Sequence, residues 1–100
     1  MEPANSDITV SDVVVSRAGR DQGEWFYVIS ADDTYLLLAN GKDRPLDKPK
    51  RKKRKHAQLV LRSETRVAAK LRCGDKVLNG ELRRDLASLC RGMQAENRGG

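Results

Sequence analysis

Short apolar runs separated by turn-forming residues dominate the first part of the chain. The β-branched run Val13-Val14-Val15 leads into residues 17–23, which contain two glycines, and a second apolar run covers residues 24–31. A third run, residues 34–39, ends at Asn40-Gly41, the dipeptide most typical of a tight hairpin turn. Runs this short, rich in β-branched and aromatic residues, favour strands over helices. We therefore expect each of the three runs to form a strand.

Two further strands complete the predicted sheet. The Asn-Gly turn should reverse the chain into a strand near residues 42–46, and the alternating leucines of residues 58–62 predict the last strand. Pro45 and Pro49 flank the way into the basic residues 48–55, which we interpret as an extended edge or loop because proline removes a ladder donor. Five short strands with glycine turns predict a mostly β fold, a small twisted barrel.

Helical spacing replaces this pattern after residue 62 and predicts two short helices. The first helix is predicted to begin at Ser63 as N-cap and to end at Gly74. The second is predicted to begin at Asn79 as cap and to end at Gly92. The second helix carries an apolar stripe, formed by Leu82, Leu86, Leu89 and Cys90. The stripe needs a covering surface. The barrel or the first helix is the expected partner, with a second subunit or another protein as the alternatives.

The length and composition suit one small domain with an extension. We divide the 100 residues into a flexible leader (1–7), a barrel (8–62), a helical extension (63–95) and a tail (96–100). No run approaches the roughly 20 apolar residues that cross a bilayer, and the N-terminal residues lack a signal-peptide pattern. We expect a cytoplasmic protein with no membrane association that is monomeric when free.

The positive charge is concentrated in one short segment. Residues 1–41 carry a net charge of −5, residues 42–56 carry +7 and residues 57–100 carry +4. Seven Lys and Arg side chains within residues 48–55 account for the basic character of the whole chain, whose net charge is +6. Such a cluster suits RNA phosphates. A solvated, disordered charge block or a nuclear-localisation-like address is the alternative reading.

Two other features suit RNA contact. Arg17 and Arg20 lie in the glycine-containing segment 17–23, where they could reach phosphates or bases, although the glycines could equally serve only the turn. Aromatic side chains stack on unpaired bases when they are exposed. In a barrel this small they are needed first for the core. The aromatic residues are Trp25, Phe26, Tyr27 and Tyr35.

The sequence shows no catalytic constellation. His56 is the only histidine and stands beside the cations, and Cys73 and Cys90 are too few for a four-ligand zinc site. There is no phosphate-binding glycine motif. We expect two reduced, partly buried cysteines, no enzymatic activity, no metal and no cofactor.

Residues 13–23, followed by an apolar strand, resemble the KOW motif of ribosomal proteins and transcription elongation factors. With the Asn40-Gly41 hairpin and the basic residues before Leu59, the region is similar to KOW-bearing large-subunit ribosomal proteins. The resemblance implies an SH3-like β-barrel that binds RNA, ribosomal RNA above all, as a ribosome-associated translation protein. By position it implies loop contacts from Arg17 and Arg20, and a flanking patch of Lys42, Arg44, Lys48, Lys50, Arg51, Lys52, Lys53, Arg54 and Lys55.

The chain departs from this family in its acidic N-terminal part, so only one side of the barrel is expected to face RNA. The resemblance also leaves a second function open. KOW domains can dock on transcription or translation proteins, and here the C-terminal leucine stripe would provide the interface. DNA binding is a third alternative.

Overall fold

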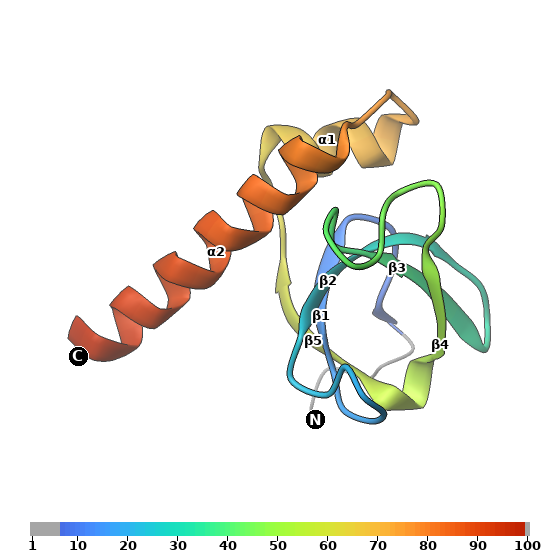
Figure 1. Cartoon of the computed structure of the whole chain (residues 1–100), viewed down its shortest axis with the longest axis horizontal. Coiled ribbons are helices and arrows are strands. Elements are labelled where there is room, and N and C mark those ends of the chain that lie inside the picture. The colour runs from blue at the N-terminus through green and yellow to red at the C-terminus, as the bar shows by residue number, and fades with distance from the viewer. Residues whose placement is uncertain (1–6, 100) are drawn as a thin grey trace.

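The protein consists of one antiparallel sheet followed by two helices (Figure 1). The structure is a computed structural model that describes the backbone of residues 7–99 and the side chains of residues 7–92. Apart from Asp7, the predicted leader lies outside the described residues. The elements are β1 (Asp12–Ser16), β2 (Trp25–Ala31), β3 (Tyr35–Ala39), β4 (Lys50–Lys53), the 3-10 turn η2 (Arg54–His56), β5 (Ala57–Arg62), α1 (Arg66–Cys73) and α2 (Asn79–Gly99).

The five strands follow the order β4-β3-β2-β1-β5. Bulges interrupt the β1–β5 pairing between Val13 and Val14 and the β2–β3 pairing between Val28 and Ser30. Bulges increase local twist and bend a sheet, and Figure 1 shows the strands curling around the inner side of the sheet. Within residues 7–99, the edge strands β4 and β5 are joined through η2 but are not hydrogen-bonded neighbours.

The inner side of the curved sheet holds a core drawn from almost every strand. Val14, Phe26 and Val28 are at most 1% exposed and pack together there. Alternation along each strand sends every second side chain inward, which explains why neighbouring residues fall into different clusters. The remaining members of this inner cluster are Ile8, Leu36, Leu38 and Ala57.

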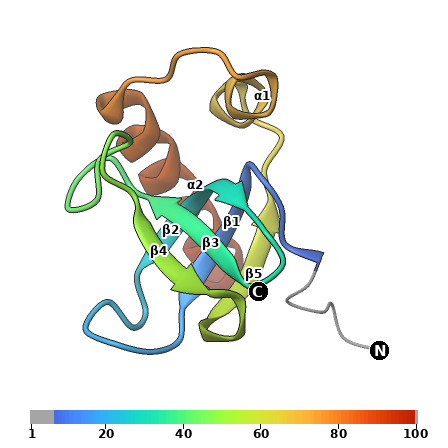
Figure 2. The same ribbon diagram turned by 90° about the vertical axis from the view of Figure 1, so that its right-hand side faces the viewer.

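The outer side of β1, β2 and β3 is covered by the helices. Tyr27 and Ala39 are fully buried against Leu82 and Leu86 of α2 and Val67 of α1. Figure 2 shows α2 behind the sheet and α1 beyond the upper end of β5. Burial of a leucine stabilises a fold by about 1.5–3 kcal/mol, so these contacts fix the first turns of α2. The predicted packing of the leucine stripe on the sheet is confirmed.

The helix ends differ from the predictions at two positions. Thr65, not Ser63, is the N-cap of α1, since its side chain accepts a hydrogen bond from the Ala68 amide. Gly74 ends α1 in the left-handed conformation, as predicted. The second helix is not short, because α2 continues through Gly92, where we expected its end, and runs to Gly99. The Met-Gln-Ala-Glu sequence after Gly92 favours helix, so the predicted tail is helical within the described residues.

The Asn40-Gly41 segment does not form the predicted two-residue hairpin. A type I′ turn needs positive φ at both central residues, yet only Gly41 has it, with φ 77°. The Asn40 side chain instead accepts hydrogen bonds from the Lys42 and Arg44 amides at 2.8 and 3.0 Å. The resulting loop extends through residue 49. The fourth strand is therefore the basic segment itself, and the strand predicted at residues 42–46 was wrong.

Candidate nucleic-acid interface

The β1–β2 loop (residues 17–24) is a compact turn that holds two arginines at the surface. Gly23 adopts φ 91°, a conformation that favours glycine, and its amide donates a hydrogen bond to the Ser16 carbonyl at 2.8 Å. The loop is also attached to η2 through a 2.8 Å hydrogen bond from the Arg17 amide to the His56 carbonyl. The side chains of Arg17 and Arg20 are exposed.

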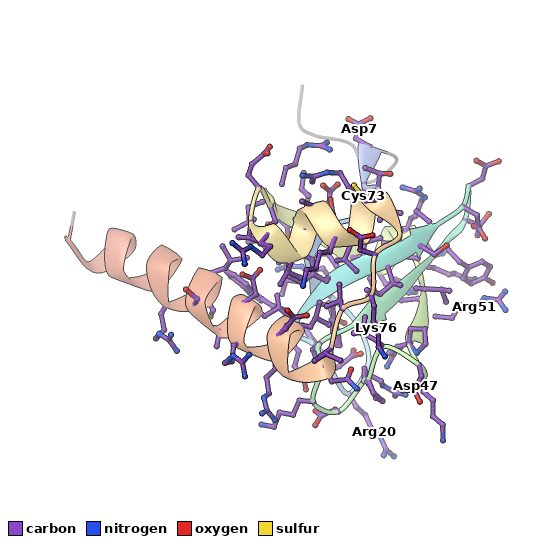
Figure 3. The ribbon with its side chains drawn as sticks, turned by 90° about the horizontal axis from the view of Figure 1, so that it is seen from above. Asp7, Arg20, Asp47, Arg51, Cys73 and Lys76 are labelled. Atoms are coloured by element: carbon purple, nitrogen blue, oxygen red, sulfur yellow. The ribbon has the colours of Figure 1, made fainter. Side chains whose placement is uncertain are left out.

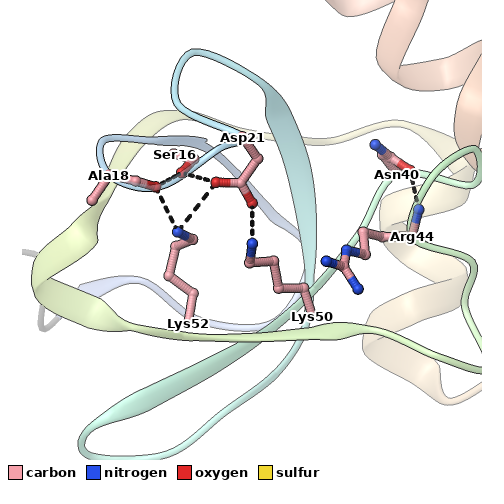
Figure 4. Close-up of polar contacts among 7 residues, drawn as sticks. All are labelled: Ser16, Ala18, Asp21, Asn40, Arg44, Lys50 and Lys52. Atoms are coloured by element: carbon pink, nitrogen blue, oxygen red, sulfur yellow. Dashed lines mark hydrogen bonds and ion pairs between the residues drawn. The ribbon is translucent and has the colours of Figure 1, made fainter.

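Asp21 links this loop to β4 (Figure 4). Its carboxylate lies 2.7 Å from the Lys50 ammonium and 3.3 Å from that of Lys52. The Ser16 hydroxyl lies 2.7 Å from the same carboxylate, and Lys52 also donates to the Ala18 carbonyl at 2.9 Å. Burial alone would raise the pKa of Asp21, but the hydrogen bonds from Lys50, Ser16 and Lys52 lower it to about 2. The loop is thus tied to the basic strand by a partly buried ionic cluster.

The basic strand presents different side chains on its two faces. Lys50 and Lys52 pair in register with Leu38 and Leu36, which belong to the inner core cluster. Lys52 is only 8% exposed. Arg51 and Lys53 pair with Leu37 and Tyr35 and are exposed on the outer face. Alternation along a strand therefore divides a segment that the sequence presented as one charge cluster.

Arg54 connects three segments. Its guanidinium donates to the Asp32 carbonyl at 2.6 Å and to the Ile8 carbonyl at 2.9 Å, and its amide donates to the Thr34 carbonyl at 2.9 Å. These bonds attach the β2–β3 turn and the N-terminal segment to η2. The next residue, Lys55, is exposed.

The structure brings together arginines that are distant in the sequence. Arg20 of the β1–β2 loop and Arg44 of the β3–β4 loop line one pocket of about 260 Å³, with Lys50 between the two loops. Asp21, Glu24 and Asp43 also line this pocket. Asp21 pairs with Lys50, whereas Glu24 and Asp43 form no ion pair with another described side chain.

Most of the predicted contact residues are exposed, but they do not line a single pocket. Arg20 and Arg44 line the pocket described above, whereas Lys53 of β4 and Lys55 of η2 line a pocket of about 320 Å³ with Asp33. Lys50 and Arg54 are partly buried, and Lys52 is buried. The exposed members of the predicted set are Arg17, Arg20, Lys42, Arg44, Lys48, Arg51, Lys53 and Lys55.

One surface feature lay outside the predicted contact set. Phe26 and Tyr27 are core residues, as expected, and Trp25 packs against the helix-covered cluster. Tyr35 is different, because it lies on the outer face of β3 and the Arg51 guanidinium carbon stands 3.9 Å from its ring centroid. Residues 35–38, Tyr-Leu-Leu-Leu, show no alternation of polar and apolar side chains, so no sequence signal indicated this outward position.

A second polar cluster attaches the helices to the sheet. The Tyr27 hydroxyl donates to the Asp85 carboxylate of α2 and lies 2.7 Å from the Ser63 hydroxyl. Thr65 also donates to Asp85, at 2.9 Å. Burial and the Asp85 carboxylate raise the pKa of Tyr27 to about 12, so its hydroxyl is protonated at neutral pH. This cluster is structural and lies on the opposite side of the sheet from the inner core.

The remaining candidates for chemistry are sparse. Among the side chains of residues 7–92, no group of three or more His, Cys, Asp and Glu residues is arranged to hold a metal ion. Cys73 is exposed, contrary to the expected partial burial, Cys90 is half-buried, and both are free thiols. The part of the chain that the structure describes contains no helix long and apolar enough to cross a membrane. No protein-family profile matches the chain, and no curated protein matches it.

Proposed function

We propose that this chain is a non-catalytic RNA-binding protein that docks on folded RNA through the β1–β2 loop and the exposed cations of the β3–β4 loop, β4 and η2. The observation that carries the proposal is the pocket at which Arg20 and Arg44 meet. Two arginines that are separated in the sequence line one concave surface there. Guanidinium groups bind phosphate oxygens in bidentate fashion.

The fold supports the same proposal. Five antiparallel strands, strongly curved and joined through a 3-10 turn between β4 and β5, suit an SH3-like barrel of the KOW type. The resemblance of residues 13–23 to the KOW motif supplies the class of ligand, and ribosomal RNA is the preferred candidate. Phosphate contacts position such a protein on RNA without reading its sequence.

The carboxylates around the pocket restrict how RNA can approach. Glu24 and Asp43 line the same pocket as Arg20 and Arg44, and none of these four forms an ion pair with another described side chain. A phosphate must therefore contact the guanidinium groups at the rim, away from the carboxylates. The two negative charges weaken RNA binding, and their removal should strengthen it.

The salt dependence of binding to purified ribosomal RNA tests the proposal. With roughly five to seven phosphates contacted, the log–log slope should lie at about −3 to −5. Arg20→Gln/Arg44→Gln should lower affinity about tenfold or more and make the slope shallower by about 2. Glu24→Gln/Asp43→Asn should raise affinity.

A charge-matched control separates the site from net charge. Arg66 and Lys76 are exposed, belong to α1 and the α1–α2 connection, and form no ion pair with a described side chain. Arg66→Gln/Lys76→Gln removes the same two positive charges and should leave the slope nearly unchanged. Equal slopes in the two double variants would reject the Arg20–Arg44 site. Competition by duplex DNA at fixed salt distinguishes RNA from DNA binding.

The alternative of a leucine-based protein interface receives less support. Leu82 is 0% and Leu86 6% exposed because both pack against the sheet. A partner that bound through this stripe would have to displace α2. Recovery of proteins in a pull-down that persists after ribonuclease treatment and depends on these leucines would favour the alternative.

A further inference from the structure

The outer face of the β3–β4 edge carries a partly apolar pocket that shares no lining residue with the Arg20–Arg44 pocket. Tyr35 and Leu37 of β3 and Arg51 of β4 line it, together with Ala31, and its volume is about 410 Å³. Ser30 and Asp32 complete its lining. The register places Leu37 opposite Arg51 and Tyr35 opposite Lys53, so these side chains share one face of the sheet.

This patch lies beyond the area that the helices cover. Ala39, on the same face of β3, is fully buried within the helix-covered cluster, whereas Tyr35 and Leu37 remain partly exposed. Figure 3 shows Arg51 at the side of the molecule opposite to α2. The surface formed by Tyr35, Leu37 and Arg51 therefore remains accessible when α1 and α2 are packed on the sheet.

The chemistry of the pocket suits a flat, uncharged ring. The Arg51 guanidinium stands over the Tyr35 ring at 3.9 Å from the centroid, and Arg51 is itself exposed. Guanidinium and phenol planes both stack on nucleobases. Leu37 and Ala31 add apolar surface at the same place.

Asp32 disfavours a phosphate in this position. The backbone amides of Tyr35 and Thr34 donate to its carboxylate at 2.7 and 2.9 Å and hold its pKa below the usual range, so it is ionised at neutral pH. A carboxylate repels a phosphate, but it accepts hydrogen bonds from the amino group of adenine, cytosine or guanine. Lys53 is exposed and follows Arg51 on the outer face of β4. Its ammonium group can therefore contact the phosphate next to such a base.

We propose that the Tyr35–Arg51 platform binds one unpaired nucleobase of the RNA, stacked on the guanidinium–phenol pair. The inference rests on the proposed RNA-binding function and adds a class of ligand, a single-stranded or bulged nucleotide, to a surface that otherwise contacts phosphates. A purely phosphate-binding protein would not distinguish an RNA strand from the same strand without its bases.

The experiment compares two short oligonucleotides with equal numbers of phosphates, an oligoadenylate and its abasic counterpart. Wild-type protein should bind the oligoadenylate roughly tenfold more tightly, as expected for one stacked base. Tyr35→Leu should remove this preference and leave the affinity for the abasic strand unchanged. Tyr35→Phe should keep the preference, because the ring is retained.

A substitution of Arg51 provides a second, independent test of the platform. Arg51→Lys keeps the charge but loses the planar group, so it should reduce the preference for the oligoadenylate without changing the salt slope. Thermal unfolding of each variant confirms that the sheet is intact. Equal wild-type affinity for the two strands, or equal losses on both in Tyr35→Leu, would overturn the platform.

These outcomes remain distinguishable from failure of the proposed function. Salt-dependent binding to ribosomal RNA that is sensitive to Arg20 and Arg44, without any base preference, would leave the phosphate surface standing and remove the platform. If wild-type protein showed neither salt-dependent binding to ribosomal RNA nor a preference for the oligoadenylate, RNA binding would be rejected. Capture of a protein that survives ribonuclease and depends on Tyr35 would assign the platform to a protein ligand and overturn the nucleobase proposal.

Discussion

Both faces of β4 carry basic side chains, but the side chains on the two faces make different contacts. On the inner face, Lys50 and Lys52 are held by Asp21, and Lys52 has 7% of its side chain exposed. On the outer face, Arg51 stacks on Tyr35 and Lys53 extends into solvent. The comparison shows that a count of basic residues overstates the charge available to a ligand, because a strand directs alternate cations to different environments.

The lysines on the inner face of β4 hold the β1–β2 loop in place. Through Asp21, the two lysines hold the β1–β2 loop against the strand, and thereby fix the backbone from which Arg20 projects. The outer face contributes exposed charge and a stacking surface. One face of this four-residue strand thus orders the neighbouring loop, and the other carries exposed side chains of the candidate interface.

The largest expected difference between the faces is in stability. Lys52→Met should lower the free energy of unfolding by about 2–4 kcal/mol, because Asp21 loses one of its two cations and the Ala18 carbonyl its donor. Lys53→Met, on the outer face, should change it by less than about 0.5 kcal/mol. Urea denaturation of the two variants measures both. Similar losses at the two positions would show that the faces do not differ energetically.

A second difference should appear at acid pH. The folded protein holds the pKa of Asp21 at about 2, below its ordinary value of 3.8. Its stabilisation, about 2 kcal/mol, is fully present above the unfolded-state pKa and is lost as pH falls from about 4 to about 2. Asp21→Asn lacks this titration, so the stability gap between wild type and variant should narrow by that amount across the window. Urea denaturation at each pH measures this difference in the free energy of unfolding. A difference that stays constant from about pH 4 to about pH 2 would contradict the role of Asp21.

The smallest expected effect separates the faces in RNA binding. Lys53→Gln should weaken binding several-fold and make the salt slope shallower by about 1, because one phosphate contact is lost. Lys52→Met should leave the slope unchanged, because its ammonium is engaged by Asp21 and Ala18. Titration of both variants with ribosomal RNA across a salt series gives the two slopes. Equal changes would mean that the inner lysine also reaches RNA.

Much of the fold was predictable from local pattern. The runs at 13–16, 24–31, 34–39 and 58–62 all form strands within a residue or two of the predicted bounds. The fourth strand was misplaced because Asn40 bonds its own loop instead of adopting positive φ. The basic segment was interpreted as an edge or loop because a strand of lysines has no apolar alternation to reveal it.

The site was predictable in outline but not in detail. Composition identified the cations, yet only the register of β3 and β4 shows which of them face Asp21 and which face Tyr35. From the sequence, Asp21 is only one of the acidic residues of the N-terminal part, because a carboxylate in a turn gives no indication of a partner on a distant strand. Long-range pairing of this kind depends on the tertiary arrangement, and the sequence pattern of either segment alone does not contain it.

The turn at Gly41 couples the basic loop to the long helix. A Cβ at this position would overlap the backbone oxygen of Asn79, the first residue of α2, and the Asn79 side chain accepts a 2.8 Å hydrogen bond from the Leu46 amide. The loop that carries Lys42 and Arg44 is therefore interlocked with the base of a helix of 21 residues, about 30 Å long. The position of these two cations therefore depends on the packing of α2 on the sheet through Leu82 and Leu86.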